Sequence, residues 1–289
     1  MANIKSFIVL ASFAILATQD ARAMNPTIGS AGGVNNDESP LESLISTEAQ
    51  AKIDARKAGG MVQTLDTFNG SRSVDLRSRD TAVKQQFSAA KCAGLFHTKV
   101  GTCSAFGLTA ALENALGGSV NLSERQLWSQ YCIPSSEAAL KAMTTGKGQV
   151  EENYWPQADV SAPYDYSRAT RYKVLEVHAL EDNLVAMLEA LDRGSPLYFA
   201  INTPSEMYAR KAYTSAGSGN TGGGHALAIV GYKLDETVEG GGWLLIKNSW
   251  GPANGENGYN WLAMGYCKRQ GNYCSAWSID RAGLAPAVQ

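Results

Sequence analysis

Three short stretches, far apart in the chain, carry a cysteine, a histidine and an asparagine in that order. These residues are Cys103, His225 and Asn248, and the last two follow Cys103 by 122 and 145 residues. This order and spacing are typical of a thiol nucleophile, an imidazole that exchanges protons with it and an amide that orients the imidazole. The chemistry predicted is covalent acyl transfer through sulfur.

The local sequence predicts how these groups act on one another. Cys103 lies where a predicted helix begins, and the unpaired N–H groups at a helix start favour a thiolate. A protonated His225 favours it further, so we expect a thiolate–imidazolium pair. Asn248 is expected to accept the other imidazole N–H, and Trp250 to cover that hydrogen bond from water.

Composition excludes several classes of function. The 289 residues are 44% hydrophobic and 18% charged, which suits one domain or two lobes with ample core. A net charge of −2 provides no positive field for nucleic acid or an anionic membrane. We expect no nucleic-acid partner and no cofactor.

The N-terminus predicts a signal peptide over residues 1–23. Lys5 precedes a short apolar run over residues 7–17, and Ala-Arg-Ala at 21–23 is a small-x-small cleavage signal. The run is shorter than the roughly 20 residues that span a bilayer, so we expect no membrane anchor. The protein is therefore predicted to be exported, to a secreted or periplasmic destination.

Residues 24–70 differ in composition from the rest of the chain. Residues 25–40 are rich in Gly, Ser, Asn and Pro, and residues 42–57 have helical spacing. A propeptide that covers a cleft and a plain solvated linker both fit this pattern. The globular domain is expected over residues 71–289.

Export also decides how the five cysteines are interpreted. In an oxidising compartment they predict two disulfides and one free thiol. Cys267 and Cys274 are close in sequence and are predicted to close a small loop. Cys92 and Cys132 are predicted to form the second bridge, which leaves Cys103 free. No Cys-x-x-Cys or His-Glu-x-x-His run occurs in the sequence, so no metal site is expected.

Within the globular part, helices come first and most strands come later. Helices are predicted over residues 104–116, 122–131, 137–143 and 184–191. Strands are predicted over residues 172–180, 197–201, 225–233, 242–247, 259–264 and 275–279. This order favours an α+β domain with two lobes.

At this point the residues resemble those of the papain-like cysteine proteases. The matching stretches are SVDLR at 73–77, VKQQ at 83–86, LSERQL at 122–127, KNSWG at 247–251 and GENGY at 255–259. The resemblance covers residues 73–276. It implies a helical lobe that carries Cys103, an antiparallel β lobe that carries His225 and Asn248, and a peptide-binding cleft between them.

The resemblance also implies an activity. The family's oxyanion-hole glutamine falls on Gln86, which with the Cys103 N–H would stabilise a tetrahedral oxyanion. The expected protein is a monomeric cysteine peptidase, made as a zymogen, that hydrolyses peptide or protein substrates through a thioester. The alternatives are a Cys–His amidohydrolase acting on cell-wall peptides and a non-catalytic papain-like binding module.

The chain departs from the family between Gln86 and Cys103, which are 17 positions apart. The extra residues, 87–99, include His97. In one branch of the family, of the cathepsin X type, a histidine in a short insertion here holds the C-terminal carboxylate of the substrate. By that analogy the protein would be a carboxypeptidase; otherwise the insertion is a disulfide-pinned surface loop.

Two smaller departures lie beside the predicted nucleophile and base. The tryptophan that follows the nucleophile in the family is replaced by Ser104. Gly223 and Gly224 precede His225, either as a turn or as a wall without bulk beside the substrate's P2 side chain. The second interpretation predicts a roomy P2 pocket.

Overall fold

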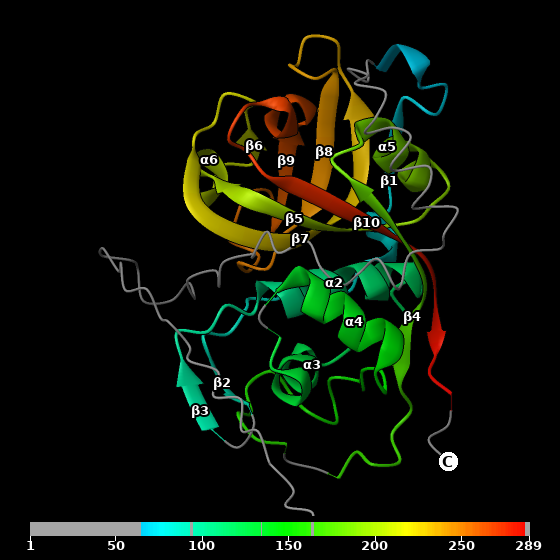
Figure 1. Cartoon of the computed structure of the whole chain (residues 1–289), viewed down its shortest axis with the longest axis vertical. Helices are drawn as coiled ribbons and strands as arrows, with labels where there is room; N and C mark the ends of the chain where they lie inside the picture. Colours follow the sequence, from blue (N-terminus) through cyan, green and yellow to red (C-terminus); the bar gives the residue numbers. More distant parts are fainter. Residues whose placement is uncertain (1–64, 93–94, 134, 163–164, 287–289) are drawn as a thin grey trace, which may run out of the picture.

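The computed structural model describes residues 65–92, 95–133, 135–162 and 165–286. The predicted signal peptide and residues 24–64 lie outside the described residues. The described chain forms two lobes, one of helices and one built on a large sheet (Figure 1). This is the α+β, two-lobed fold expected from the sequence.

The helical lobe contains three helices and a hairpin. They are α2 (Cys103–Ala115), α3 (Glu124–Tyr131), α4 (Ser136–Thr145), β2 (Ala89–Cys92) and β3 (Leu95–Thr98). The Ser123 hydroxyl caps α3 by accepting from the Gln126 N–H at 3.0 Å. Ser135 caps α4 in the same way, through the Ala138 N–H at 3.2 Å. These caps satisfy N–H groups that a helix start leaves unpaired.

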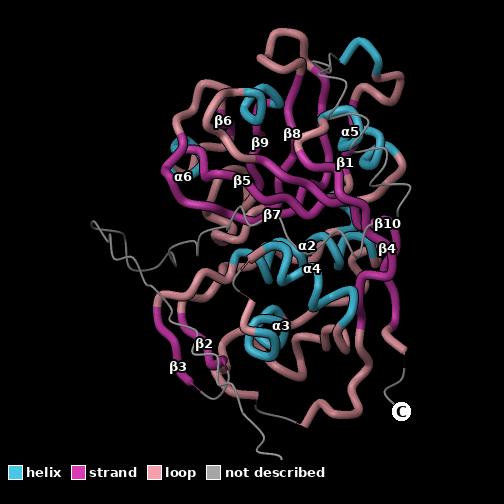
Figure 2. Tube along the Cα trace, viewed as in Figure 1, coloured by secondary structure: helices cyan, strands magenta, loops and turns pink. Residues whose placement is uncertain are grey.

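The β lobe is an eight-stranded, mostly antiparallel sheet (Figure 2). Its strands are β1 (Ser73–Asp75), β4 (Tyr172–Glu181), β5 (Leu197–Pro204), β6 (Tyr213–Thr214), β7 (Asn220–Leu234), β8 (Gly242–Lys247), β9 (Tyr259–Ala263) and β10 (Cys274–Leu284). The order is β4-β10-β5-β7-β8-β9-β6, with β1 paired to β7. Helices α5 (Leu184–Asp192) and α6 (Ser205–Tyr208) and the 3-10 helices η2 (Leu65–Thr67), η3 (Arg77–Arg79) and η4 (Met264–Lys268) complete the described elements.

Helix α2 packs directly against β7 of the sheet (Figure 1). At Gly107 a Cβ atom would lie 2.7 Å from the Leu227 nitrogen, so only glycine fits at this crossing. The close approach brings the start of α2 beside the part of β7 that follows His225. The two lobes therefore meet where the predicted nucleophile and base lie.

The insertion after Gln86 is a two-stranded hairpin, β2–β3, rather than an irregular loop. Its backbone is closed at the base by the Val100 N–H, which donates to the Ser88 carbonyl at 2.9 Å. The Cys92–Cys132 disulfide ties β2 to the residue after α3. The insertion is pinned by a disulfide, as expected, but its strand pairing was not predicted.

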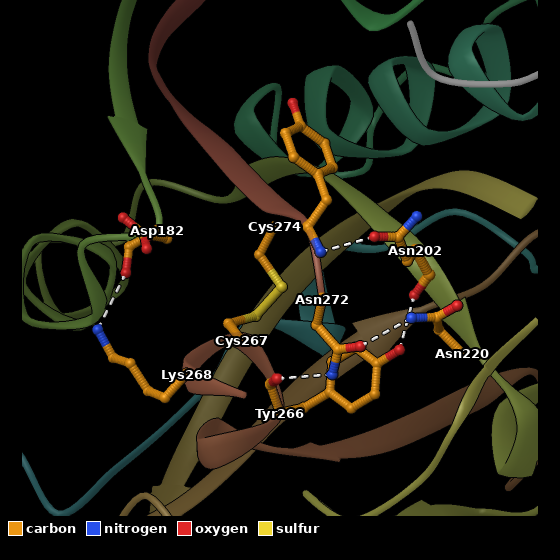
Figure 3. The surroundings of a disulfide bond; sticks show 9 residues. Asp182, Asn202, Asn220, Tyr266, Cys267, Lys268, Asn272 and Cys274 are labelled. Carbon is orange, nitrogen blue, oxygen red and sulfur yellow. Dashed lines mark hydrogen bonds between the residues drawn. A yellow bond between two sulfur atoms is a disulfide. The ribbon is translucent and has the colours of Figure 1, made fainter. Parts of the chain in front are cut away.

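The second disulfide joins Cys267 at the end of η4 to Cys274 at the start of β10 (Figure 3). Amide side chains brace the same turn. Asn272 donates to the Tyr266 carbonyl at 2.9 Å and accepts from Asn220 Nδ2 at 3.1 Å. Cys103 is then the free cysteine, and it is buried.

The predicted helices and strands agree with the structure in type and closely in position. One local interpretation is corrected: Gly222, Gly223 and Gly224 belong to strand β7 and are not a turn. Asp75 and Arg77 form an ion pair, at 2.6 Å. Over the described part of the chain, no helix is both long and apolar enough to cross a bilayer.

Candidate active site

Cys103 is the first residue of α2 and is 1% exposed. The preceding residue, Thr102, is anchored by a hydrogen bond from its hydroxyl to the Phe87 carbonyl at 2.7 Å. Burial raises the pKa of the Cys103 thiol, and the backbone N–H groups of Ala226 and Ser104 oppose this rise. The Ala226 N–H places the Cys103 sulfur beside the residue that follows His225.

His225 lies on β7 and is fully buried. Its ring stacks on Trp250, with centroids 4.5 Å apart and planes at 15°. Its Nε2 lies 3.0 Å from Asn248 Oδ1. Nδ1, on the other side of the ring, has no hydrogen-bond partner within the part of the chain that the structure describes. The ring is thus hydrogen-bonded at Nε2, whereas Nδ1 is buried and unpaired among the described residues.

Burial of both groups acts against the thiolate–imidazolium pair that the sequence predicts. Burial lowers the pKa of His225 to about 4, against the opposing effect of the Asn248 hydrogen bond. Burial also raises the pKa of Cys103. Desolvation is the largest cause of both shifts. The ion pair therefore stays a prediction for the active protein.

Asn248 follows β8 and makes hydrogen bonds with both ends of its amide. Its Oδ1 accepts from the Ser249 N–H at 2.8 Å and faces His225. Its Nδ2 donates to Asn260 Oδ1 at 2.8 Å. Asn260 is 0% exposed, and it was not singled out from the sequence. The signal that marks it is an amide inside the otherwise apolar and aromatic strand β9.

Gln86 is joined to the segment that carries Asn248. Its backbone N–H donates to the Ser249 carbonyl at 2.7 Å, and its Oε1 accepts from the Ser249 hydroxyl at 2.8 Å. Since Oε1 faces Ser249, the Nε2 donor points the other way. The neighbouring Gln85 pairs with Trp250 as an antiparallel bridge. The glutamine and the asparagine are therefore positioned by one structural unit.

The replacement of tryptophan by Ser104 is accommodated from the opposite lobe. Tyr198 of β5 is completely buried, and its hydroxyl lies beside the hydroxyls of Ser104 and Ser136. Its ring packs on Trp277 with centroids 5.6 Å apart. A large aromatic side chain from the sheet thus lies beneath the start of α2, next to the small residue.

His97 and the glycines before His225 lie apart from this arrangement. His97 is half-buried on β3, where its register partner is Ala90. No contact of the described residues joins His97 to Cys103 or His225. Gly223 is half-buried near the start of β7, and a Cβ there would meet only the Thr221 hydroxyl, at 3.7 Å.

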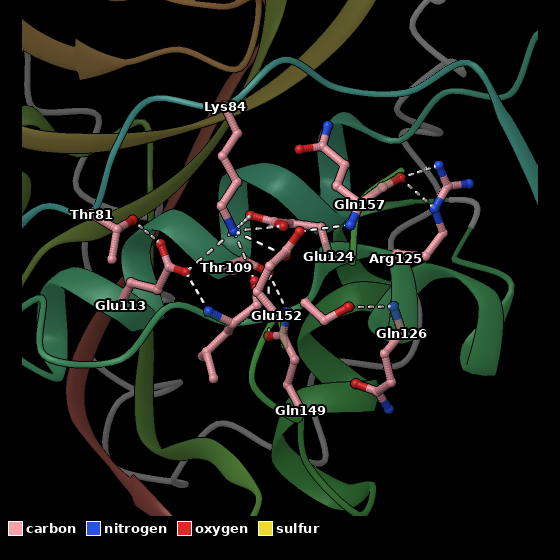
Figure 4. Close-up of polar contacts among 12 residues, drawn as sticks. Thr81, Lys84, Thr109, Glu113, Glu124, Arg125, Gln126, Gln149, Glu152 and Gln157 are labelled. Carbon is pink, nitrogen blue, oxygen red and sulfur yellow. Dashed lines mark hydrogen bonds and ion pairs between the residues drawn. The ribbon is translucent and has the colours of Figure 1, made fainter. Parts of the chain in front are cut away.

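A buried charged cluster surrounds Lys84, two residues before Gln86 (Figure 4). Lys84 Nζ lies 2.8 Å from Glu124, 3.5 Å from Glu152 and 3.6 Å from Glu113. Burial raises the pKa of Glu124 to about 7, because one ammonium cannot compensate three carboxylates. The cluster fixes the backbone two residues before Gln86.

Residues 71–278 match the family described as papain family cysteine protease. The chain belongs to this family. Pro-cathepsin H of Mus musculus is 29% identical over 207 residues, which are 65% of this chain and 58% of that protein. Cysteine endopeptidase Rep1 of Oryza sativa subsp. japonica is 30% identical over 207 residues, which are 65% of this chain and 52% of the relative.

Solved structures show the same fold. Xylellain, a cysteine protease from Xylella fastidiosa, aligns with a TM-score of 0.60 and 18% identity, over 89% of this chain and 98% of that one. The Carica candamarcensis cysteine protease CMS1MS2, solved with E-64, aligns with a TM-score of 0.56 and 24% identity, over 73% and 99%. The chain spans about half the length of the curated relatives that match over 207 residues.

Proposed function

We propose that this protein is an exported cysteine peptidase that hydrolyses peptide bonds through a thioester on Cys103. The observation that carries the proposal is the geometry around His225. Nε2 is held by Asn248 Oδ1 at 3.0 Å, Trp250 covers the ring, and Nδ1 is left without a partner among the described residues. An imidazole held in this way can accept a proton at Nδ1 and nowhere else.

In the proposed mechanism, Cys103 and His225 exchange one proton, between the sulfur and Nδ1. As the sulfur attacks the scissile carbonyl, the S–C bond forms and the thiol proton moves to His225 Nδ1. The imidazolium then gives this proton to the leaving amine as the C–N bond breaks. Water, deprotonated by the same nitrogen, hydrolyses the thioester and regenerates the thiol.

The tetrahedral intermediates carry a negative oxygen that needs donors. We propose that Gln86 Nε2 and the Cys103 backbone N–H supply them. The support is the orientation of Gln86, whose Oε1 accepts from Ser249 and whose Nε2 therefore faces the opposite side. Pre-oriented donors of this kind stabilise the transition state without reorganisation.

The remaining proposals concern substrate binding and the N-terminal residues of the chain. Substrate is proposed to bind between the lobes as an extended peptide, with the open space at Gly223 receiving a large P2 side chain. Residues 1–23 are proposed to direct export, and residues 24–70 to act as a propeptide. A relative named as a pro-cathepsin and a matching protease solved in its proform support the propeptide.

An epoxide thiol reagent and a casein digest test the function together. The wild-type chain, after processing, is expected to lose activity with one equivalent of reagent bound, and Cys103→Ala is expected to bind none. Casein digestion with no action on purified peptidoglycan separates the peptidase from a cell-wall amidohydrolase. Failure of the wild-type protein to take up the reagent would contradict the proposed nucleophile.

A further inference from the structure

We propose that Asn260 is a positioning residue that fixes the orientation of the Asn248 amide and, through it, the tautomer of His225. Asn260 lies on β9, opposite Ile246 of β8, and Asn248 follows the end of β8. The orientation of the Asn248 amide is inferred from the hydrogen bonds alone. Its consequence for turnover rests on the proposed function.

Asn260 joins Asn248 to a backbone carbonyl. Its Oδ1 accepts from Asn248 Nδ2 at 2.8 Å, and its own Nδ2 donates to the Lys211 carbonyl oxygen at 2.8 Å. Asn260 is completely buried, and Asn248 is 3% exposed. Water therefore does not compete for these groups, and each unmade hydrogen bond would leave a buried polar atom unsatisfied.

The direction of this series of hydrogen bonds is set by the Lys211 carbonyl. A carbonyl oxygen can only accept, so the group that Asn260 turns toward Lys211 must be its NH₂. Oδ1 of Asn260 then faces Asn248, and this acceptor requires the NH₂ of Asn248. Asn248 Oδ1 is thereby directed to His225. A flip of either amide would place two acceptors or two donors against each other.

The last group in the series is the His225 imidazole. Asn248 Oδ1 is an acceptor, so His225 carries its proton on Nε2, and Nδ1 keeps the lone pair that the mechanism needs. With Asn248 flipped, its NH₂ would face Nε2 and the proton would move to Nδ1. That tautomer cannot take the thiol proton.

A second contact limits how much Asn260 contributes. The Ser249 backbone N–H also donates to Asn248 Oδ1, at 2.8 Å, and holds the same orientation. Asn254 Oδ1 lies 3.4 Å from Asn248 Nδ2, at the long end of hydrogen-bond range. Loss of the Asn260 contact is therefore expected to weaken the orientation without abolishing it, which corresponds to about a tenfold effect on kcat.

The tautomer can be measured without any activity. The full chain with Cys103→Ala, labelled with ¹⁵N histidine, contains only three histidines. At a pH where the His225 ring is neutral, its nitrogen shifts are expected to report one tautomer, protonated at Nε2. Adding Asn260→Leu is expected to shift both nitrogens toward a mixture of tautomers. Unchanged His225 shifts in the Asn260→Leu protein would overturn the proposal.

Asn260→Asp separates orientation from packing. The aspartate has nearly the shape of asparagine and still accepts from Asn248 Nδ2, although it loses the donor to Lys211. It is expected to keep the Nε2 tautomer that Asn260→Leu loses. An equal loss in both variants would assign Asn260 a packing role only. Asn260→Ala replaces the leucine variant in this comparison if leucine prevents folding.

A double-mutant cycle tests the consequence for turnover. Asn260→Leu is expected to lower kcat about tenfold with KM nearly unchanged, and to have less than a twofold effect when Asn248→Ala is already present. A similar loss in both backgrounds would show that Asn260 does not act through Asn248. The matched control is Asn114→Leu, a buried asparagine on α2 that donates to the Leu76 carbonyl at 2.9 Å. It is expected to lower stability while kcat of the folded protein is kept.

The two proposals fail in different ways. If the peptidase proposal is wrong, the wild-type protein takes up no thiol reagent and cleaves no casein, while the histidine spectra still report on Asn260. If only the positioning role is wrong, the wild-type protein is active and Asn260→Leu leaves kcat and the His225 tautomer unchanged.

Discussion

The two lobes hold their buried polar groups by different physical means. In the helical lobe, Lys84 lies among three glutamates, 2.8 to 3.6 Å away. In the β lobe, neutral amides at Asn248 and Asn260 are joined at 2.8 Å. Charges give strong attraction but titrate and need compensation, whereas amides do not titrate and have a defined direction. The directional network lies where the orientation of His225 has to be set.

The largest effect on stability is expected from the charged cluster. Lys84→Met removes the only ammonium that contacts the three glutamates among the described residues, and it is expected to cost about 3–5 kcal/mol of unfolding free energy. Lys211→Met is the control, because Lys211 is largely exposed and its pair with Glu206 is worth at most about 1 kcal/mol. Equal losses in urea denaturation of the two variants would contradict the assignment of Lys84.

A Gln86 variant tests the connection between the lobes, because Gln86 is hydrogen-bonded to Ser249. Gln86→Ala is expected to lower kcat by about 10²–10³, or about 2.7–4 kcal/mol of barrier, because it removes one oxyanion donor. Single-turnover kinetics on a peptide ester measures this change, and KM is expected to change little. The control is Gln130→Ala near the end of α3. A change in KM alone would indicate that Gln86 binds substrate uniformly and does not act on the transition state.

The pH dependence of stability separates the lobes by sign. The pKa of His225 is lowered to about 4, so its contribution is complete above about pH 6.5 and is lost as pH falls toward 4, by about 3 kcal/mol. Glu124 has a pKa raised from 4.5 to about 7, so its contribution is complete below about pH 4.5 and is lost as pH rises to 7. The two opposite effects cancel between about pH 4.5 and 6.5, so denaturation of Cys103→Ala from pH 4 to 8 is expected to show nearly constant stability over that range.

Two variants of Cys103→Ala separate the two opposite effects. Adding His225→Phe is expected to leave a fall in stability from about pH 4.5 to 7, and adding Glu124→Gln to leave a rise in stability from about pH 4 to 6.5. A pH profile that stays flat in both variants would mean that the two lobes titrate as one unit. The separation of the charged and amide networks would then be wrong.

The smallest effect distinguishes the two disulfides, one in each lobe. Cys92–Cys132 spans 40 residues and Cys267–Cys274 spans 7. Loop-closure entropy predicts a loss of about 4 kcal/mol when the first is replaced by serines and about 2.5 kcal/mol for the second. Thermal unfolding of the two double variants measures the difference. The reverse order would show that contacts in the folded state outweigh chain entropy.

Much of the site was predictable from the linear order of residues. Helix α2 and strands β7 and β8 follow from periodicity, because an amphipathic or buried element must repeat its apolar positions. The residues proposed as nucleophile, base and orienting amide were marked by residue type and spacing. The pairing of the β2–β3 hairpin was not, since an insertion of mixed composition has no strong strand pattern.

The sequence by itself indicated which residues are proposed to carry the chemistry and which elements hold them, because residue type and period are local properties. Tertiary structure alone decided three things: that Asn260 stands behind Asn248, that Tyr198 lies beside Ser104, and that burial raises the pKa of Cys103 and lowers the pKa of His225. Each depends on neighbours from distant parts of the chain. The pKa of a group is set by its solvent access and surrounding dipoles, and neither exists before the lobes pack together.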